Sequence, residues 1–378
     1  MRKIVRAQAF VPSLRKRFEG AGRWPIFSAH HFSDISNGRD NNLHLIRLLA
    51  AYAVLFGHCW PLLAGPAVHD PLSEMLRSYS PFQRSIPGIA VYTFFFLSGF
   101  LVTRSMVLGR GVASYLLSRA LRIYPALIIV IGLLVFVLGP IMTSLSLEEY
   151  FSKPLTWKYL KTNIVMWNVE FRLPGVFSDN AFKGVNGSLW TLPAEIRCYA
   201  LVLLFWILGV FSSRTIFNTV AIGCLIGGYL FKDHLLFFSM KGHVEMAFFF
   251  LLGSAVFVNR DAITLSVPIL GALIFLALML HGQPLYHLAA GLALSMGILY
   301  TAFVVPCLLP QLNRFGDISY GVYIYAYPVQ QIIIEAHSGE ISPLTLAAYA
   351  TPIVLVCATL SWFLIERPCL NLKAKLLR

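Results

Sequence analysis

The chain has 378 residues, of which 57% are hydrophobic and only 12% are charged, with a formal net charge of +13. Its mean hydropathy is +0.71, whereas a soluble domain carries roughly 25% charged residues. This composition excludes an ordinary soluble protein and predicts an all-α integral membrane protein. A β-barrel is also excluded, because barrel strands alternate in polarity over about ten residues, whereas the apolar runs here are continuous.

The apolar runs predict a bundle of about ten transmembrane helices, in chain order. The predicted spans are 43–63, 86–107, 123–145, 189–211, 216–231, 243–259, 264–281, 286–308, 317–336 and 343–365. Two of the middle spans are short or interrupted, so the count could be roughly nine to eleven. A long polar connection at 146–188 contains an aromatic-rich piece, 156–167, that suits the membrane interface.

The distribution of basic residues predicts the orientation of the bundle. With the N-terminus inside, the cytoplasmic segments hold 20 of the 30 Lys and Arg residues, the outer loops hold nine, and Arg197 lies within a span. This bias follows the positive-inside rule and places both termini in the cytoplasm. The predicted organisation is a basic cytoplasmic tail (1–42), a transmembrane domain (43–368) and a short basic cytoplasmic tail (369–378).

Several other classes of feature are not predicted. The positive charge is accounted for by topology and the basic tail, and no nucleic-acid-binding motif accompanies it. The N-terminal segment lacks an apolar stretch ahead of a small-residue cleavage site, so it is not a cleavable signal peptide. The six cysteines are scattered without a C-x-x-C pair, which predicts neither a disulfide framework nor a metal site.

Two ionisable residues, Arg47 and His58, lie in the first apolar run. Eleven residues of helix turn through three full turns plus roughly 20° and rise about 16 Å, so both side chains project from one face. Ionisable groups inside a membrane span are costly and usually mark a functional path. The structural alternatives are that Arg47 anchors at the headgroups and that His58 is a hydrogen-bonded structural histidine. Together they favour a site, because a neutral imidazole can take a proton from a hydroxyl.

A basic cluster follows the second span. Arg119 and Arg122 are three residues apart and project from one side of a helix, and Arg104 and Arg110 are assigned to the same cytoplasmic loop. Arginine forks suit phosphate geometry, so the cluster could hold an anionic cytosolic donor. The alternative is a contact with lipid headgroups.

The segment NGSLWTLPAEIRCY (186–199) places Trp190 near an interface and Glu195 and Arg197 inside an apolar helix. Two residues apart, Glu195 and Arg197 point about 200° from one another and cannot simply pair. Glu195 is therefore expected to orient His58 or to stabilise its imidazolium form. The alternative is a structural ion pair between helices.

Polar side chains also lie along the ninth predicted span. Asp317 is expected to cap the start of this helix, where the dipole favours a carboxylate. A stripe of hydroxyls and amides follows and could hydrogen-bond a sugar or a thioester carbonyl, or serve as glue between helices; it comprises Tyr320, Tyr323, Tyr327, Gln330 and Gln331. The terminal Glu366–Arg367 pair is interpreted as structural.

In this order, the motifs resemble the acyltransferase-3 family of polytopic membrane acyltransferases. The matching features are the Arg-x10-His of the first span, FFFLSGFLVTRS (94–105), the R-x-x-R of SRALRIYP, GSLWTLPAE, ISYGVYIYAYP and the terminal IERP. The resemblance covers about residues 43–368. It implies transfer of an acyl group, usually acetyl, from acyl-CoA to a hydroxyl of a carbohydrate or a lipid-linked glycan.

The resemblance also implies roles for individual residues. His58 would be the essential histidine, Arg47 its essential partner, and Arg119 and Arg122, with Arg104 nearby, the contacts for the donor phosphates. The expected acceptor-binding residues are Trp190, Tyr320, Tyr323, Tyr327 and Gln331. Many relatives carry a histidine where this chain has Ala326, so that residue's role does not transfer. Some relatives also carry a C-terminal SGNH-type domain, which this sequence does not contain.

The resulting hypothesis is a bacterial inner-membrane enzyme. Acetyl-CoA would be the donor substrate rather than a resident cofactor, and His58 would act as general base or briefly carry the acyl group. Membrane lipids and a glycan would be its partners. Two other classes remain open: a glycan transporter or flippase, although no repeated halves are visible, and a non-catalytic subunit of a polysaccharide assembly complex.

Overall fold

The structure is a computed structural model that describes residues 28–36, 38, 41–109, 111–231, 240 and 242–376. Arg110 and most of the predicted N-terminal tail lie outside these residues. The chain folds as an all-α membrane protein. Within the described residues the only paired strands are β1 (His30–His31) and β2 (Thr264–Leu265), which run antiparallel with His30 opposite Leu265.

Every predicted span coincides with helical structure. The corresponding helices are α2 (Leu43–Ala64), α4 (Ile86–Val107), α5 (Val112–Leu133), α9 (Leu192–Ile207), α10 (Arg214–Leu230), α11 (His243–Val258), α12 (Val267–Met279), α13 (Tyr286–Phe303), α15 (Ser319–Ala336) and α16 (Pro343–Ser361). Among the described residues, six helical segments are long and apolar enough to cross a membrane. The helices α10, α11 and α12 are shorter, and tyrosines and glutamines lower the hydropathy of α15. The count of ten spans and the orientation stay predictions.

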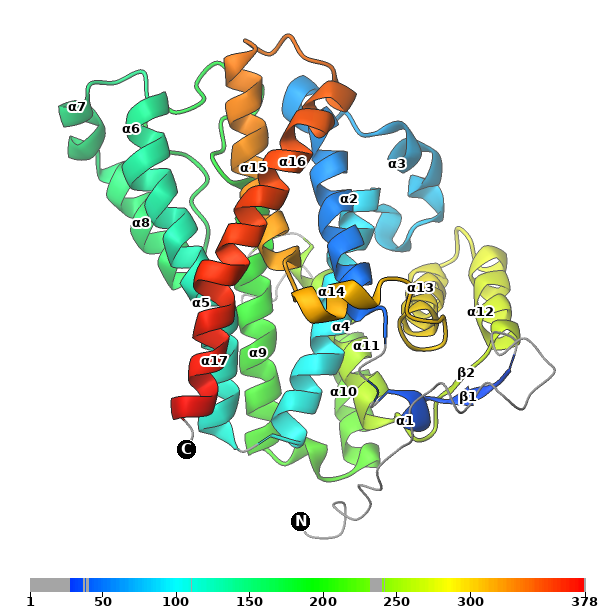
Figure 1. Ribbon diagram of the computed structural model, residues 1–378. Coiled ribbons are helices and arrows are strands. Elements are labelled where there is room, and N and C mark those ends of the chain that lie inside the picture. The colour runs from blue at the N-terminus through cyan, green and yellow to red at the C-terminus, as the bar shows by residue number, and fades with distance from the viewer. Residues whose placement is uncertain are drawn as a thin grey trace.

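Shorter elements complete the chain. These are α1 (Phe32–Ile35), α3 (Pro71–Leu76), η3 (Arg77–Tyr79), η4 (Pro81–Gln83), η5 (Leu134–Leu138), α6 (Gly139–Met142), α7 (Leu147–Ser152), α8 (Pro154–Val165), η6 (Gly187–Thr191), η7 (Val210–Ser212), α14 (Pro310–Phe315), η8 (Trp362–Glu366) and α17 (Arg367–Leu376). The aromatic-rich piece of the long connection forms α8. The first and last described helices, α1 and α17, lie toward one end of the molecule, whereas α3, α6 and α7 lie toward the other (Figure 1).

Two helices extend beyond the predicted spans. The third span was placed from residue 123, but α5 begins at Val112, so Arg119 and Arg122 project from a helix as their spacing predicts. Arg104 lies in α4 rather than in the loop to which it was assigned. At the other end of the chain, η8 and α17 continue the helix of α16 beyond residue 365. Helix continues past these charged residues because Arg122 and Glu366 pair with each other, at 3.5 Å between Nη1 and Oε2.

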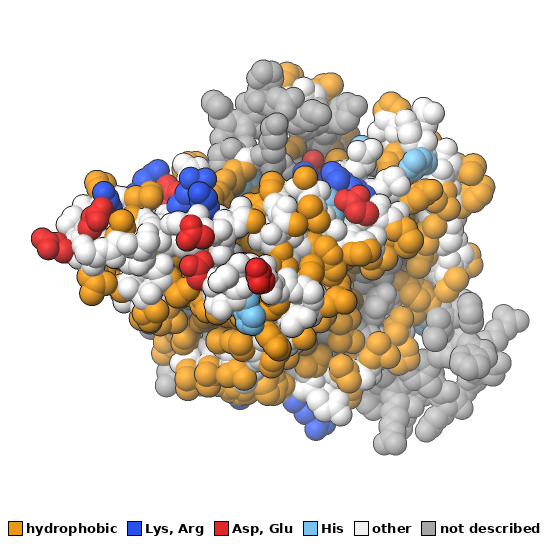
Figure 2. Space-filling model, turned by 90° about the horizontal axis from the view of Figure 1, so that it is seen from above, with side chains coloured by type: hydrophobic (Ala, Val, Ile, Leu, Met, Phe, Trp, Pro, Cys, Tyr) orange, Lys and Arg blue, Asp and Glu red, His pale blue; other side chains and the backbone are white. Residues whose placement is uncertain are grey.

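Large apolar side chains cover much of the outside of the bundle. Ile128 and Phe136 on the α5–η5 segment, Phe275 on α12 and Val356 on α16 are all exposed. A soluble protein rarely leaves so much contiguous apolar surface open to water, whereas lipid tails match it. Seen from the end that carries α7, charged side chains gather mainly on the α7 side, and hydrophobic side chains border much of the rest (Figure 2).

Helices α4 and α11 pack closely against each other through small residues. A Cβ atom on Gly99 would overlap the carbonyl oxygen of Phe250, and one on Gly253 would overlap that of Phe96. Beside this contact, the Thr103 hydroxyl donates to Ser254 Oγ at 2.9 Å. Small residues at helix interfaces let backbones approach closely in membranes, where no hydrophobic force drives helices together.

Replacing Gly99 by alanine should therefore destabilise the protein. The added methyl group must push α4 and α11 apart, and overpacking of this kind costs about 1–3 kcal/mol. Thermal unfolding of the detergent-solubilised protein would measure the loss. Gly132→Ala is the matched control, because no atom lies within 4 Å of the Cβ position at Gly132. Equal melting temperatures for the two variants would contradict the close packing of α4 on α11.

Helix α2 packs beside α15 and α16 (Figure 1). The amide of Gln330 on α15 donates to the Leu55 carbonyl oxygen of α2 at 2.8 Å. Gly321 of α15 lies against Ala358 of α16, where a Cβ would come within 2.8 Å of the Ala358 Cα atom. These contacts fix the polar stripe of α15 against the helix that carries Arg47 and His58.

Candidate active site

Two cavities open along one face of α2. The first, here the arginine cavity, has a volume of about 640 Å³ and is lined by Arg47, Arg119 and Arg122. The second, here the histidine pocket, has a volume of about 220 Å³ and is lined by His58. Val91 and Tyr323 line both spaces. The two cavities therefore adjoin, and Arg47 lines one of them whereas His58 lines the other.

Arg47 and His58 lie on a common stripe of α2, as their spacing predicts. His44 and Arg47 line the arginine cavity, whereas Val54, His58 and Pro61 line the histidine pocket. The Arg47 side chain is 24% exposed and its Nη1 lies 2.8 Å from an Asp317 carboxylate oxygen. Arg47 is thus held by an ion pair inside the bundle rather than serving only as a headgroup anchor.

Asp317 is the centre of a buried ion-pair cluster that the sequence did not indicate. Asp317 lies just before Ile318, the N-cap residue of α15, and its carboxylate accepts from the Ser319 backbone N–H at 3.2 Å. The same carboxylate lies 2.8 Å from Arg47 and 2.7 Å from Arg122, and Arg122 also reaches Glu366. The cluster therefore ties α2, α5, α15 and η8 together at the arginine cavity.

The three arginines assigned to the donor differ in their surroundings. Arg122 is engaged by Asp317 and Glu366. Arg119 also lines the arginine cavity, with its guanidinium 5.6 Å from the centre of the Tyr199 ring and its buried Nε without a hydrogen-bond partner. Arg104 lines neither cavity, and its Nη1 donates to the Ser36 carbonyl oxygen at 3.3 Å. Arg119 is thus the best placed of the three to contact a ligand.

Glu195 lies in the arginine cavity with Arg47 rather than beside His58. Its carboxylate accepts hydrogen bonds from Tyr199 and, at 3.4 Å, from Ser98. No hydrogen bond or ion pair joins Glu195 to His58 in the described part of the chain, so the expected pairing is not formed. The reason is that Glu195 opens into the arginine cavity, whereas His58 opens into the pocket on the other side of Tyr323.

His58 is supported by an aromatic ring instead. Tyr327 meets the imidazole edge-on, with ring centres 5.8 Å apart, and the buried Nδ1 of His58 has no hydrogen-bond partner. A Cβ on Gly187 would overlap Tyr327, so only glycine lets this tyrosine occupy its position. Tyr327 lines neither cavity and therefore positions His58 rather than contacting a substrate.

The remaining residues of the predicted stripe have separate roles. Tyr323 shares a hydrogen bond with Thr191 at 2.9 Å where the two cavities adjoin. Tyr320 lines the arginine cavity, with its hydroxyl on the Ile123 carbonyl oxygen at 3.1 Å. Gln331 lines neither cavity, and its amide donates to the carbonyl oxygens of Phe182 and Gly184 at 2.6 and 2.7 Å. Gln331 therefore binds the loop that contains Phe182 and Gly184 instead of a substrate, because the carbonyl groups of this loop need hydrogen-bond donors.

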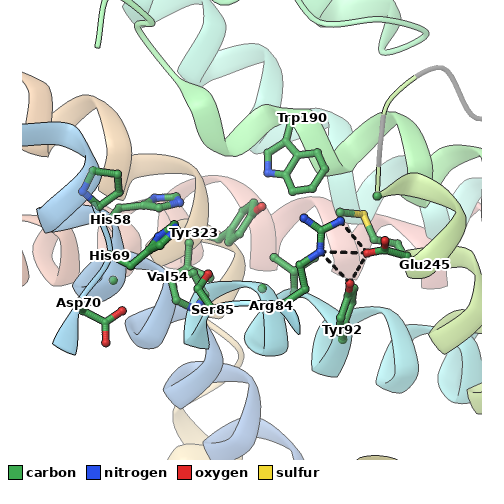
Figure 3. A pocket seen from close by; sticks show the side chains of 17 residues that line it. Val54, His58, His69, Asp70, Arg84, Ser85, Tyr92, Trp190, Glu245 and Tyr323 are labelled. Carbon is green, nitrogen blue, oxygen red and sulfur yellow. Dashed lines mark hydrogen bonds and ion pairs between the residues drawn. The ribbon is translucent and has the colours of Figure 1, made fainter. Parts of the chain in front are cut away.

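The histidine pocket also contains Trp190, as predicted, and a charged cluster that the sequence reading missed (Figure 3). Arg84 donates through Nε and Nη2 to one Glu245 oxygen at 2.9 and 2.7 Å, and the Tyr92 hydroxyl donates to the same oxygen. Burial opposes the charge of Arg84, but Tyr92 and Glu245 outweigh it and raise the pKa of its guanidinium. Only the charges of Arg84 and Glu245, close to the ends of apolar helices, could have signalled this cluster.

A family described as "Acyltransferase domain" matches residues 40–366 of the chain. The chain belongs to the acyltransferase-3 family. An O-acetyl transferase of Shigella phage Sf6 is 29% identical over 343 residues, which cover 87% of this chain and 96% of the relative. Nodulation protein 10 of Rhizobium leguminosarum bv. viciae is 28% identical over 375 residues, covering 90% and 96%. No solved structure matches the chain.

This acyltransferase-3 protein is an enzyme of the membrane, and its two cavities differ in chemistry. The arginine cavity offers cationic side chains for an anionic ligand, and the histidine pocket is lined by the His58 imidazole. The two spaces adjoin at Val91 and Tyr323.

Proposed function

We propose that the protein is a bacterial inner-membrane O-acyltransferase. It moves an acetyl group from cytosolic acetyl-CoA to a hydroxyl of a cell-surface or lipid-linked glycan. The observation that carries the proposal is the placement of Arg47 and His58 on one face of α2, in two adjoining cavities. The relative named an O-acetyl transferase supports the choice of acetyl and of a hydroxyl acceptor.

The arginine cavity is the proposed site of the donor. A coenzyme A molecule carries several phosphate charges, which arginine guanidinium groups bind with charge-assisted hydrogen bonds. Arg119 is the first candidate for a phosphate contact because its buried Nε lacks a partner. The cavity lies on the side of His58 nearer the start of α2, which the positive-inside rule assigns to the cytoplasm. The donor would therefore enter from the compartment in which acetyl-CoA is made.

His58 is the proposed general base. Its neutral imidazole takes the proton from the acceptor hydroxyl as the oxygen attacks the thioester carbonyl carbon. The carbon–sulfur bond then breaks, and His58 returns the proton to the departing coenzyme A thiolate. In a variant of this route His58 first accepts the acetyl group on nitrogen and then passes it to the hydroxyl. Tyr327 holds the imidazole edge-on in either case.

Arg119→Ala should weaken the binding of acetyl-CoA by about tenfold or more, because a hydrogen bond to a charged group contributes about 1.5–3 kcal/mol. Calorimetric titration of acetyl-CoA into the detergent-solubilised protein would measure the dissociation constant. Arg104→Ala is the matched control, since it removes an arginine that lines neither cavity. If both variants bind acetyl-CoA like the wild type, the donor site lies elsewhere.

The reaction itself is tested on the product. Surface glycans from cells with and without the protein would be compared by mass spectrometry, with the expectation of an acetyl-sized mass difference that depends on the protein. Purified protein supplied with labelled acetyl-CoA and the extracted glycan should transfer the label unaided. Identical glycan masses in the two strains, together with no transfer by the purified protein, would refute the proposal.

A further inference from the structure

One side of the histidine pocket is lined by charged and polar residues that take no part in the proposed proton transfer by His58. Two donors converge on one carboxylate oxygen of Glu245, which belongs to α11. They are Arg84, from the segment before α4, and Tyr92, from α4. The Arg84 and Glu245 side chains are 37% and 26% exposed, so both retain surface that a ligand can reach. Because this cluster lines the same pocket as His58, it can contact the acceptor from which His58 takes a proton.

Trp190 forms a fixed aromatic surface in the same pocket. One side of its indole is stacked on His243, with ring centres 5.9 Å apart and planes at 20°. A His243 ring nitrogen also lies 2.9 Å from the Trp190 carbonyl oxygen. Figure 3 places the indole above the space between Tyr323 and Arg84. The C–H bonds on the apolar face of a sugar ring pack well against an aromatic face held in this way.

A glycine lets the backbone approach both of these features. A Cβ on Gly242 would lie 3.1 Å from Arg84 Nη2 and 3.5 Å from the Trp190 ring. Gly242 also adopts a φ of +91°, which disfavours any other residue. The guanidinium and the indole are therefore built into one surface rather than meeting by chance at the protein exterior.

The charge of the pocket restricts what this surface can bind. The described lining residues that can carry charge are Arg84, Asp70, Glu245 and two histidines, His58 and His69. Two N–H groups of Arg84 are already donated to Glu245, and the buried Asp70 carboxylate accepts from Ser73. With neutral histidines, one guanidinium faces two carboxylates, so the pocket offers no net positive charge to an anionic group, whereas sugar hydroxyls can donate to Glu245.

We propose that the histidine pocket selects a neutral sugar ring as the acceptor and rejects sugars that carry a carboxylate. Trp190 stacks on the ring, Glu245 accepts from its hydroxyls, and His58 takes the proton from the hydroxyl that is acylated. The pocket, at about 220 Å³, is smaller than sites for drug-sized ligands, which favours a single ring. This inference rests on the proposed function and adds the class of acceptor to it.

The test uses acceptors that differ only in charge. Purified protein and acetyl-CoA would be supplied with the p-nitrophenyl glucuronide and galacturonide and with their methyl esters, which keep the same hydroxyls but are neutral. We expect kcat/KM for an ester to exceed that for its acid by at least about tenfold. Glu245→Gln should narrow this ratio because it removes a negative charge, whereas Glu149→Gln, on the surface helix α7, should not.

Trp190→Ala should raise KM for the ester about tenfold or more, and Trp190→Phe should retain part of the binding because a ring remains. Trp157→Ala, which removes an exposed tryptophan from α8, is the matched control. If the protein accepts none of the glycosides, a second measurement decides the question. Tandem mass spectrometry would locate the acetyl group in the natural glycan.

Two results overturn the inference while leaving the proposed function intact. These are equal or better transfer to the free acid, and an acetyl group located on a uronic or sialic acid of the glycan. If neither the glycosides nor the glycan receive acetyl from the wild-type protein, the proposed function fails and the acceptor assignment falls with it. An acetyl group located on a neutral sugar, with the ester preferred wherever a glycoside is accepted, supports both.

Discussion

His58→Ala should reduce acetyl transfer by about 10²–10⁴-fold, the contribution that a positioned acid or base typically makes. The loss should appear in kcat, because the imidazole moves a proton rather than binding the donor. The arginine cavity does not include His58, so acetyl-CoA should bind the variant as it binds the wild type. Label transfer from acetyl-CoA and calorimetric titration would separate the two quantities.

The matched control is His337→Ala, which removes an imidazole from the exposed C-terminal cap of α15 and away from both cavities. Membrane levels of both variants should equal the wild-type level. If His58→Ala transfers acetyl at the wild-type rate, His58 is neither base nor acyl carrier and the mechanism is wrong.

Asp317→Ala should destabilise the protein by about 3–5 kcal/mol, the typical loss when one partner of a buried ion pair is removed. Two arginines, Arg47 and Arg122, would lose the carboxylate that lies 2.8 and 2.7 Å from them. The Asp317 side chain is only 10% exposed, so water cannot compensate fully. Unfolding of the detergent-solubilised protein by heat or denaturant would show the loss.

Asp261→Ala gives the matched comparison. Asp261 is paired with Arg214, but both side chains are nearly half exposed, at 47% and 49%. Pairs of this kind contribute about 0–1 kcal/mol, so stability should scarcely change. Asp317→Asn keeps the size of the side chain and removes its charge, and it should retain most of the defect. A stable Asp317→Asn variant would mean that the arginines do not depend on the charge.

The positions of the helices could be predicted from the sequence because each apolar run has a length that lipid imposes. The ends of two helices could not. In its own segment, each of Arg122 and Glu366 resembles a polar residue at the end of a membrane span. The two side chains nevertheless lie close together in the fold. Local hydropathy carries no information about a partner so distant in the sequence, so the prediction ended the helices early.

The face of a helix from which a side chain projects could be predicted, whereas the residues that it contacts could not. The spacing of Arg47 and His58 placed them correctly on one stripe of α2. The same reasoning separated Glu195 from Arg197, and in the structure Arg197 instead lies 4.5 Å over the Trp167 ring. Which helix faces Glu195 depends on the packing of the whole bundle, and the pattern of one helix cannot supply it.

The Arg84–Glu245 cluster could not be predicted, because its two members are 161 residues apart. Nothing local distinguishes Arg84 from a basic residue of an ordinary polar loop. The cluster forms only because Gly99 and Gly253 let α4 and α11 pack closely, which brings the start of one helix beside the start of the other.

Helix α2 has one more property that follows from its regular form. Between Arg47 and His58 it is uninterrupted, and its only internal proline, Pro61, comes after the histidine. The two side chains are therefore separated by a fixed rise of about 16 Å. In the proposed mechanism, this distance separates the arginine cavity, where the phosphates of the donor would bind, from the imidazole of His58. A carrier with a shorter or longer arm would place its thioester away from the imidazole, so α2 would select coenzyme A by length as well as by charge.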